Sequence, residues 1–237
     1  MVSVYNNLTE IALSSRKIEL IEKYNKIVQY GRMNPVWFIE EIFRIPLLDY
    51  QKAAIMGTWI AEEAVWVMSR GSGKSFLGGI YISARSILYP YHTTYIMTGT
   101  GSQSKETFKK IEDIANHRVG TLQNSSDVLY NEVCTEQGSQ LKFVHEKTSS
   151  RCKFYNGSVI QSLIGVEENI VGKRCDLTYY DEAGKISENY FSLTEPFTVV
   201  NQDFNLGKGL DSSILPLKVP HQHLYTSSAE DVNSHLY

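Results

Sequence analysis

The stretch that most constrains the fold of this chain is Ala64 to Ser75, AVWVMSRGSGKS, where an apolar run leads into a glycine-rich, basic loop. The apolar run predicts a buried β-strand, and the residues from Lys74 to about Leu88 predict a helix. A strand, a glycine-rich turn and a helix in this order direct several backbone N–H groups and the positive helix end at one spot. The stretch therefore predicts a phosphate-binding loop in an α/β fold.

The loop matches most of the P-loop pattern G-x-x-x-x-G-K-S/T, although Met68 stands where the pattern has its first glycine. In such a loop the lysine reaches the β- and γ-phosphate oxygens and the final hydroxyl binds Mg²⁺. We therefore predict ATP and Mg²⁺ as ligands, with Ser75 binding the metal. The predicted nucleotide-binding segment is Ser69, Arg70, Gly71, Ser72, Gly73, Lys74 and Ser75. A chance glycine-rich loop is the alternative, which the flanking strand and helix disfavour.

Short apolar runs and helix-like segments alternate after this loop, which is typical of a mainly parallel sheet with helices on both faces. Further strands are predicted at 93–98, 141–145, 152–155, 158–164, 175–180 and 223–228, with Asn156-Gly157 as a hairpin turn, and helices at 102–116 and 187–193. The loop from Asn201 to Gln222 is long enough to suggest a function.

The residues before the first strand predict helices. One or two are expected within 8–31, another from Pro35 to about 44 with Asn34 as its N-cap, and a third capped by Asp49 and running to about 63. We therefore divide the chain into an N-terminal helical extension, 1–48, and a P-loop domain, 49–237.

Composition limits the class of protein further. The chain has 237 residues and a formal net charge of −3, and no run of apolar residues is long enough to span a bilayer. The N-terminus lacks the pattern of a secretory signal, so a cytosolic location is expected. The three cysteines, Cys134, Cys152 and Cys175, have no CxxC pairing and are predicted to be reduced thiols. The mild acidity gives no general attraction for nucleic acid, so DNA would have to bind local basic residues or a partner.

A second motif, LTYYDEAG at 177–184, places two carboxylates after a buried strand. We expect Asp181 to lie at the same sheet edge as Lys74 and to hold Mg²⁺ directly or through water. Glu182 is positioned to orient and deprotonate the attacking water. The alternative is that the acidic pair only complements the N-terminus of a helix, but its place about a hundred residues after a P-loop favours catalysis.

Two weaker elements complete the predicted site. Thr226, Ser227 and Ser228 end an apolar strand, where their hydroxyls could sense the γ-phosphate through water. Gln51, upstream of the first strand, carries an amide that could donate to and accept from the adenine edge. An ordinary polar strand end and a solvated helix glutamine are the respective alternatives.

These elements, in this order, resemble the ATPase domain of the large terminase subunit of tailed bacteriophages. The resemblance rests on SRGSGKS, MTGTGSQSKETFKKI, FYNGSVIQSL and CDLTYYDEAG, and it extends from about Trp37 to about Asp231. It implies a P-loop NTPase fold of the RecA/ASCE-like type, and a Mg²⁺-dependent ATPase that moves double-stranded viral DNA into a procapsid. It also implies a homo-oligomeric ring, a portal protein and a small terminase subunit as partners, and a location in the host cytoplasm, transiently on the portal.

The resemblance also implies roles for two arginines and for the last strand. Arg70 would approach the γ-phosphate when the site closes, and Thr226 to Ser228 would couple hydrolysis to movement. Several terminases have an Arg-Gly pair before the acidic strand that supplies a finger to the neighbouring subunit, whereas this chain has Val171-Gly172. Arg174 is our candidate for the finger, and Arg151 is the second.

Only nine residues follow Ser228, so no nuclease activity is expected from this chain. A modest basic grouping, composed of Lys109, Lys110, Arg118, Lys142, Lys147, Arg151 and Lys153, is a candidate DNA surface, with solvated charge as the alternative. Two other functions remain open. RGSGKS, DEAG and SSA also resemble motifs of the N-terminal half of a helicase, and a nucleotide-binding fragment with little turnover would have the same motifs.

Overall fold

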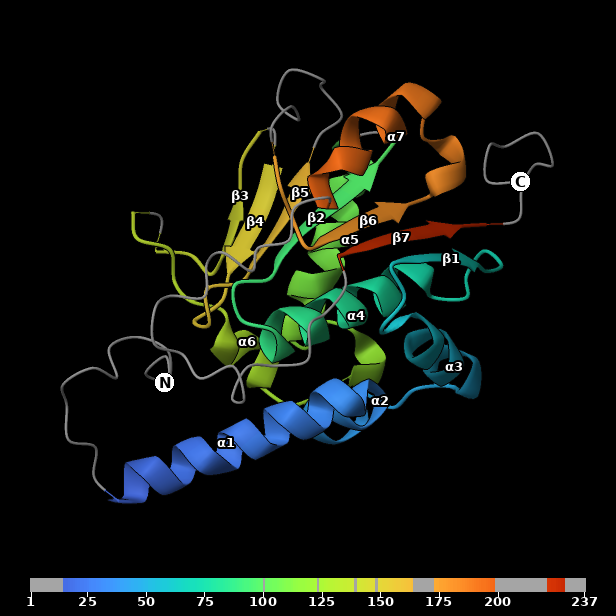
Figure 1. The fold of residues 1–237 in the computed structure, drawn as a ribbon. Coiled ribbons are helices and arrows are strands. Elements are labelled where there is room, and N and C mark those ends of the chain that lie inside the picture. Colours follow the sequence, from blue (N-terminus) through green and yellow to red (C-terminus); the bar gives the residue numbers. More distant parts are fainter. Residues whose placement is uncertain are drawn as a thin grey trace.

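The computed structural model describes residues 15–99, 101–122, 124–138, 140–147, 149–163, 173–198 and 221–228. Within this part of the chain, strands β1 to β7 form a single sheet in the order β1-β7-β6-β2-β5-β4-β3 (Figure 1). They are β1 (Glu63–Val67), β2 (Thr93–Thr98), β3 (Phe143–His145), β4 (Ser149–Lys153), β5 (Val159–Leu163), β6 (Leu177–Asp181) and β7 (Gln222–Ser227). The strands β1, β7, β6, β2 and β5 each run parallel to their neighbours in this series. At the other edge, β4 pairs antiparallel with both β5 and β3. The predicted mainly parallel sheet is confirmed.

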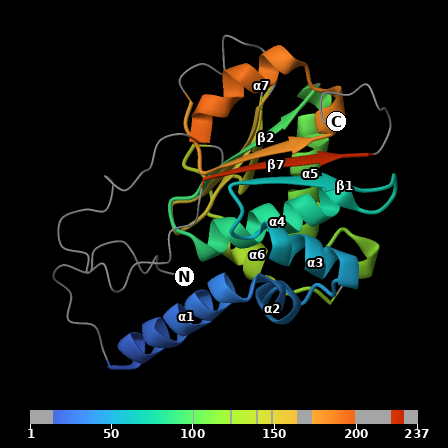
Figure 2. The same cartoon turned by 45° about the vertical axis from the view of Figure 1, so that its right-hand side comes forward.

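Helices cover both faces of the sheet, as Figure 2 shows from a second side. The short helix α7 (Glu188–Thr194) lies on one face, and α4 (Lys74–Leu88), α5 (Gly101–Ala115) and α6 (Val128–Glu132) lie on the other. The N-terminal elements are α1 (Ser15–Met33), α2 (Pro35–Trp37), the π-helix η1 (Phe38–Ile42) and α3 (Asp49–Thr58). Single turns of 3-10 helix are η2 (Gly120–Leu122), η4 (Ala183–Lys185) and η5 (Glu195–Thr198).

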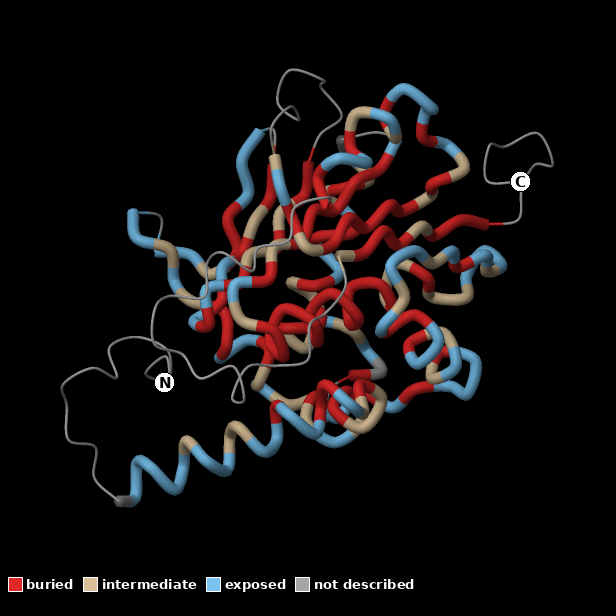
Figure 3. Tube along the Cα trace, viewed as in Figure 1, coloured by how far each residue is buried: buried red, intermediate tan, exposed pale blue. Residues whose placement is uncertain are grey.

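Successive side chains of a strand point to opposite faces of the sheet. The buried strands therefore contribute to two hydrophobic cores, one on each face. In β2, Ile96 belongs to the core beneath α4 and α5, whereas Tyr95 and Met97 belong to the core beneath α7. The buried segments in Figure 3 follow the strands and α4. Burial on both faces explains the continuous apolar runs that predicted these strands.

The larger core also includes side chains from before residue 48. Phe38, Ile39 and Ile45 are buried in the same cluster as Leu77 and Ile80 of α4. The division of the chain at residue 48 stays a prediction. No described helix is both long enough and apolar enough to cross a membrane.

The predicted bounds of α4 and β2 are confirmed, whereas other elements begin or end elsewhere. The helix expected over 35–44 is interrupted, since the π-helix η1 follows a single turn at Pro35–Trp37. Asp49 is the first residue of α3 and not its N-cap, a position that Leu48 occupies, and α3 ends at Thr58 instead of 63. Asn34 holds the N-cap position of α2, but its side chain donates to the Tyr30 carbonyl. The suspected loop at 201–222 falls almost entirely outside the described residues.

The hairpin that joins β4 and β5 turns over Tyr155 to Gly157, which includes the predicted Asn156-Gly157 pair. Gly157 has φ of 87°, and a Cβ at this position would lie 2.5 Å from the Tyr91 ring, so only glycine fits. The Asn156 amide donates to the carbonyls of Ser86 and Ile87 at the end of α4. The three cysteines are free thiols, as the sequence predicts.

Candidate active site

The predicted phosphate loop connects the end of β1 to the start of α4. Gly71 and Gly73 have φ of 78° and 82°, the left-handed region that favours glycine. Gly73 is the N-cap residue of α4, and the N–H groups of the first turn after it have no partner within the helix. A Cβ built on Gly71 or Gly73 meets no atom within 4 Å. The loop is therefore an open arc of backbone that suits an anion.

The side chain of Ser72 also has a polar atom that a ligand could contact. Its Oγ is buried and makes no hydrogen bond within the described residues. A buried hydroxyl without a partner is costly, and a ligand oxygen would satisfy it. The Ser72 carbonyl is already used, because the Tyr50 hydroxyl donates to it at 2.8 Å and ties the loop to α3.

A cleft of about 580 Å³ opens over this loop. Four of its lining side chains are cationic, namely Arg70, Lys74, Lys110 and Lys185, and one is a carboxylate, Glu182. The remaining lining residues are Gly71, Gly73, Ser75, Phe76 and Val119. Cations outnumber carboxylates in this cleft, although the net charge of the chain is negative, so the cleft suits a polyanion such as a nucleoside triphosphate.

Glu182 follows β6 and turns back toward the phosphate loop. Its backbone is left-handed, with φ of 53° and ψ of 47°, which is uncommon for a residue with a side chain. Its Oε1 lies 3.6 Å from Lys74 Nζ, whereas Oε2 lies 3.6 Å from Lys185 Nζ and accepts a hydrogen bond from the Ser228 hydroxyl at 3.3 Å. Strained backbone of this kind concentrates at functional sites.

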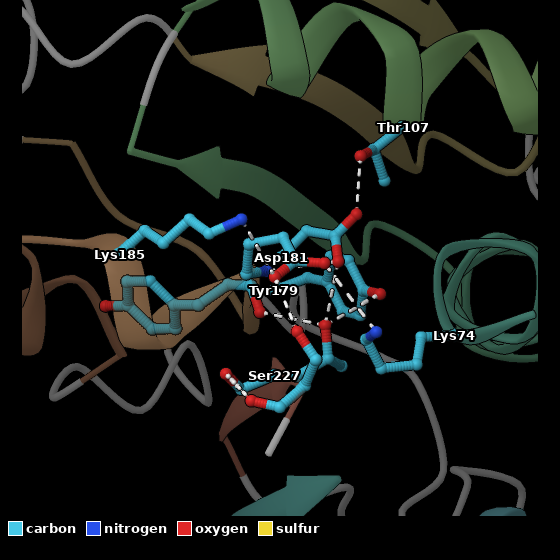
Figure 4. A network of polar contacts seen from close by, with 10 residues as sticks. Lys74, Thr107, Tyr179, Asp181, Lys185 and Ser227 are labelled. Carbon is cyan, nitrogen blue, oxygen red and sulfur yellow. Dashed lines mark hydrogen bonds and ion pairs between the residues drawn. The ribbon is translucent and has the colours of Figure 1, made fainter. Parts of the chain in front are cut away.

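Asp181, the last residue of β6, is held more tightly than its neighbour (Figure 4). The Thr226 hydroxyl donates to Oδ1 at 2.9 Å, as does the Glu182 N–H at 3.1 Å, and the Thr107 hydroxyl donates to Oδ2 at 2.7 Å. The carboxyl is buried, so these donors replace the water that an exposed carboxylate would bind. Thr107 and Lys185 were not singled out from the sequence. Lys185 had a signal, since it directly follows DEAG, but Thr107 had none.

The strand β7 lies between β1 and β6 and joins the two motifs. The Ser227 carbonyl accepts a hydrogen bond from the Met68 N–H where the phosphate loop begins. Thr226 contacts both Asp181 and the Tyr179 hydroxyl, the latter at 3.3 Å. Burial raises the pKa of Tyr179 well above its ordinary value, with the Asp181 charge as a further cause, so this hydroxyl stays protonated. All three predicted polar residues of β7 and its end, Thr226, Ser227 and Ser228, are buried beside the site.

Gln51 lies in the first turn of α3, where its amide has a local structural use. Its Oε1 accepts a hydrogen bond from the Leu48 N–H at 2.9 Å, and its Nε2 lies 3.4 Å from the Tyr50 hydroxyl. The acceptor of the amide thus satisfies a free N–H at the start of the helix. The adenine contact stays a prediction, and it requires this amide to exchange its partner.

The two candidate fingers have different surroundings. Arg174 is exposed and precedes β6, so it lies at the end of that strand opposite to Asp181. Arg151 on β4 is engaged within the chain, at 3.1 Å from Glu136 and 2.8 Å from Glu146.

The basic grouping suggested for DNA is partly neutralised. Lys153 shares Glu136 with Arg151, and Arg118 lies 3.6 Å from Glu112. Lys142 donates to the Tyr130 and Val133 carbonyls. Charges that are paired at short range contribute less to the attraction of a distant polyanion.

The donor set fits Mg²⁺ bound together with a nucleotide. Among the described residues, no group of three or more His, Cys, Asp or Glu side chains could hold a metal alone. Mg²⁺ commonly takes one or two protein oxygens, phosphate oxygens and several waters. Asp181 and the hydroxyl of Ser75 have oxygen atoms of this kind, and their use as Mg²⁺ ligands stays a prediction.

Neither a protein-family model nor a curated protein sequence matches the chain. Several solved structures match it. A mutant of the ATPase domain of the Thermus phage P74-26 large terminase is 16% identical, with a TM-score of 0.50 over 80% of this chain and 84% of that one. The bacteriophage HK97 large terminase is 12% identical, with a TM-score of 0.58 over 87% of this chain and 38% of that one. The chain thus has the P-loop fold of phage large terminase ATPase domains and spans 38% of the HK97 protein.

Proposed function

We propose that this chain is an ATP-hydrolysing motor domain of a large terminase, which drives double-stranded DNA into a procapsid. One observation supports the enzymatic part most strongly. The P-loop lysine, Lys74, lies 3.6 Å from Glu182, although Lys74 begins α4, Glu182 follows β6, and the two residues are far apart in sequence. A cation for phosphate and a candidate base for water thus face the same cleft.

The proposed chemistry needs few groups from the protein. The backbone N–H groups of Gly71 to Ser75 and the Lys74 ammonium bind the β- and γ-phosphates. Ser75 and Asp181 would hold Mg²⁺, which would supply positive charge to the phosphate oxygens. Glu182 orients a water in line with the γ-phosphorus and accepts its proton. Lys74 Nζ lies 3.6 Å from Glu182 Oε1, so a phosphate bound to this ammonium would compete with the carboxylate for it.

The placement of the two arginines is compatible with the roles that we propose for them. Arg70 lines the cleft and is proposed to approach the γ-phosphate as the site closes. Arg174 is exposed at the opposite end of β6, so it would act on a neighbouring subunit of a ring and not on its own site. Arginine fingers contribute up to about 10⁵-fold to hydrolysis. When Arg174→Ala protein is mixed into wild type, turnover should then fall by more than the fraction of variant added. A fall in proportion to that fraction would exclude this role.

The partners proposed for the motor are viral DNA, a portal protein and a small terminase subunit. A helicase half remains the second candidate function, because the same cleft would serve it. Oligomerisation on a portal would favour the terminase, and strand separation would favour the helicase.

Steady-state ATP hydrolysis tests the proposal. Wild type, Lys74→Ala and Glu182→Ala are compared over a range of protein concentrations, with and without double-stranded DNA. We expect turnover by wild type only, nucleotide binding retained by Glu182→Ala, and specific activity that rises with concentration if catalysis crosses subunits. A wild type that binds ATP without hydrolysing it under any of these conditions would leave a nucleotide-binding module.

A further inference from the structure

The contact between Thr107 and Asp181 joins two elements that the predicted motifs do not connect. Thr107 lies on α5 and is 3% exposed, and its hydroxyl donates to Asp181 Oδ2 at 2.7 Å. The two residues are 74 positions apart in the sequence. Figure 4 shows Thr107 reaching the Asp181 carboxyl from the helix side. Of the other donors, Thr226 belongs to β7 and Glu182 follows β6.

The geometry favours this long-range bond over the local alternative. A helical threonine commonly donates to the carbonyl four residues earlier, and here the Gln103 carbonyl lies 3.2 Å from Thr107 Oγ1. The hydroxyl has one proton, and the carboxylate oxygen is both nearer and charged. A hydrogen bond to a charged acceptor is roughly twice as strong as one to a neutral acceptor.

Thr107 fixes the second oxygen of the Asp181 carboxyl group, and with it the orientation of the carboxyl plane. The Oδ1 atom is already fixed by Thr226 and by the Glu182 N–H. A second fixed oxygen prevents rotation about the last side-chain bond, so the remaining lone pairs of both oxygens point in set directions. Metal ligands are typically oriented by such partners, which affect metal affinity by about 10- to 100-fold.

We infer that Thr107 is a positioning residue, which holds the Asp181 carboxylate in the orientation that receives Mg²⁺ of a bound Mg-nucleotide. This inference rests on the proposed function. Lys110, three residues after Thr107 on α5, lines the cleft, so one helix orients the metal carboxylate and also borders the nucleotide. The alignment of Asp181, at the end of β6, therefore depends on α5 as well as on the strands.

ADP affinity, measured with Mg²⁺ and with EDTA, tests the inference without requiring turnover. Thr107→Val keeps the shape and removes the hydroxyl, and Thr107→Ser keeps the hydroxyl. We expect Thr107→Val to lose most of the Mg²⁺-dependent gain in ADP affinity, by about 10-fold or more, while its affinity in EDTA stays at the wild-type level. Thr107→Ser should restore the gain.

Thr58→Val is the matched control. Thr58 is also a buried helical threonine, 4% exposed, whose hydroxyl donates to the Ala54 carbonyl and accepts a hydrogen bond from Trp66 Nε1, and it does not line the cleft. It should keep the full Mg²⁺ effect. Should Thr107→Val fail to fold, Thr107→Ala carries the same comparison.

Two results would overturn the inference, and they are distinct from failure of the proposed function. If Thr107→Val keeps the full Mg²⁺ effect, the contact does not orient the metal ligand. If Thr107→Val weakens ADP binding equally with and without Mg²⁺, the residue has a general structural role. If wild type itself shows no ADP binding or no gain from Mg²⁺, the proposed function fails and the inference fails with it.

Discussion

The helix α4 has a buried cation at each end, and the two are held in different ways. Lys74 begins the helix, is 7% exposed, and faces Glu182 across a cleft that lies open above the phosphate loop. Arg85, in the last turn of the same helix, is fully buried. Its guanidinium donates to the Trp59 carbonyl at 2.9 Å and to the Tyr81 hydroxyl at 3.1 Å.

The surroundings of Arg85 form a closed polar cluster. The guanidinium lies over the rings of Trp59, Tyr81 and Tyr89, and its Nε lies 3.3 Å from His92 Nε2. Tyr81 in turn donates to Gln222 Oε1 at 2.6 Å, which ties the cluster to the first residue of β7. This end of α4 therefore binds the helix to the amino ends of the strands.

The difference separates a structural polar cluster from a functional one. Around Lys74, the Ser72 hydroxyl has no partner within the described residues and Glu182 has a left-handed backbone. Unsatisfied and strained groups reduce stability, and they are retained where a ligand completes them. At the Arg85 end the Ser86 hydroxyl also has no partner within the described residues, but the guanidinium and the Tyr81 hydroxyl are hydrogen-bonded in an enclosed site, which is what a role in stability requires.

Replacing Arg85 should give the largest effect on stability. Arg85→Met removes the guanidinium and leaves the Trp59 carbonyl and the Tyr81 hydroxyl without this donor, so we expect the free energy of unfolding to fall by about 1–3 kcal/mol for each buried group left unsatisfied. Urea denaturation measures this loss. Lys74→Met should cost less than about 1 kcal/mol, because Glu182 keeps Lys185 and solvent nearby. Equal losses would remove the distinction between the two ends.

The pH dependence of stability should be affected next. Burial lowers the pKa of His92 well below its ordinary value of about 6.5, and the Arg85 charge lowers it further. Below pH 6.5 the unfolded chain binds a proton that the folded chain excludes, so His92 lowers stability as pH falls, by up to about 1.4 kcal/mol per pH unit. We expect His92→Asn to flatten the stability curve between about pH 6.5 and pH 5. Parallel curves for wild type and variant would contradict the assignment.

The smallest effect concerns the backbone of Glu182. A left-handed conformation costs a residue with a Cβ about 1 kcal/mol relative to glycine, so Glu182→Gly should be more stable than Glu182→Ala by that amount. Both variants lack the carboxylate and should not hydrolyse ATP. Glu188, at the start of α7, provides the control, because in a helix the alanine variant should be the more stable of the two. The same order at both positions would argue against strain at Glu182.

The sequence predicted best what depends on neighbouring residues. The bounds of α4 are confirmed because Gly73 and Tyr89-Pro90 mark its two ends, and Asp181 lies at the carboxyl edge because the buried run before it forms a strand. The hydrophobic pattern thus fixes which element a residue occupies. Even so, local competition misled the prediction at Asp49, since Leu48 holds the cap position and Gln51 supplies the capping oxygen.

Contacts that depend on strand order could not be predicted in this way. Thr107 meets Asp181 because β2 lies beside β6 and α5 follows β2, and nothing in the sequence between residues 107 and 181 states that order. The pairing of Arg151 with Glu136 likewise depends on how a loop folds over β4. The first contact gives Asp181 a partner that the sequence did not indicate, and the second engages Arg151, the second candidate for the finger, within its own chain.

Titration calorimetry with Mg-ADP on wild type, Lys74→Ala and Arg85→Lys tests the central claim most directly. The account predicts that wild type and the folded fraction of Arg85→Lys bind one nucleotide with similar affinity, and that Lys74→Ala loses measurable binding. Unchanged binding by Lys74→Ala would contradict the account, because the cleft at the start of α4 would then not be the nucleotide site.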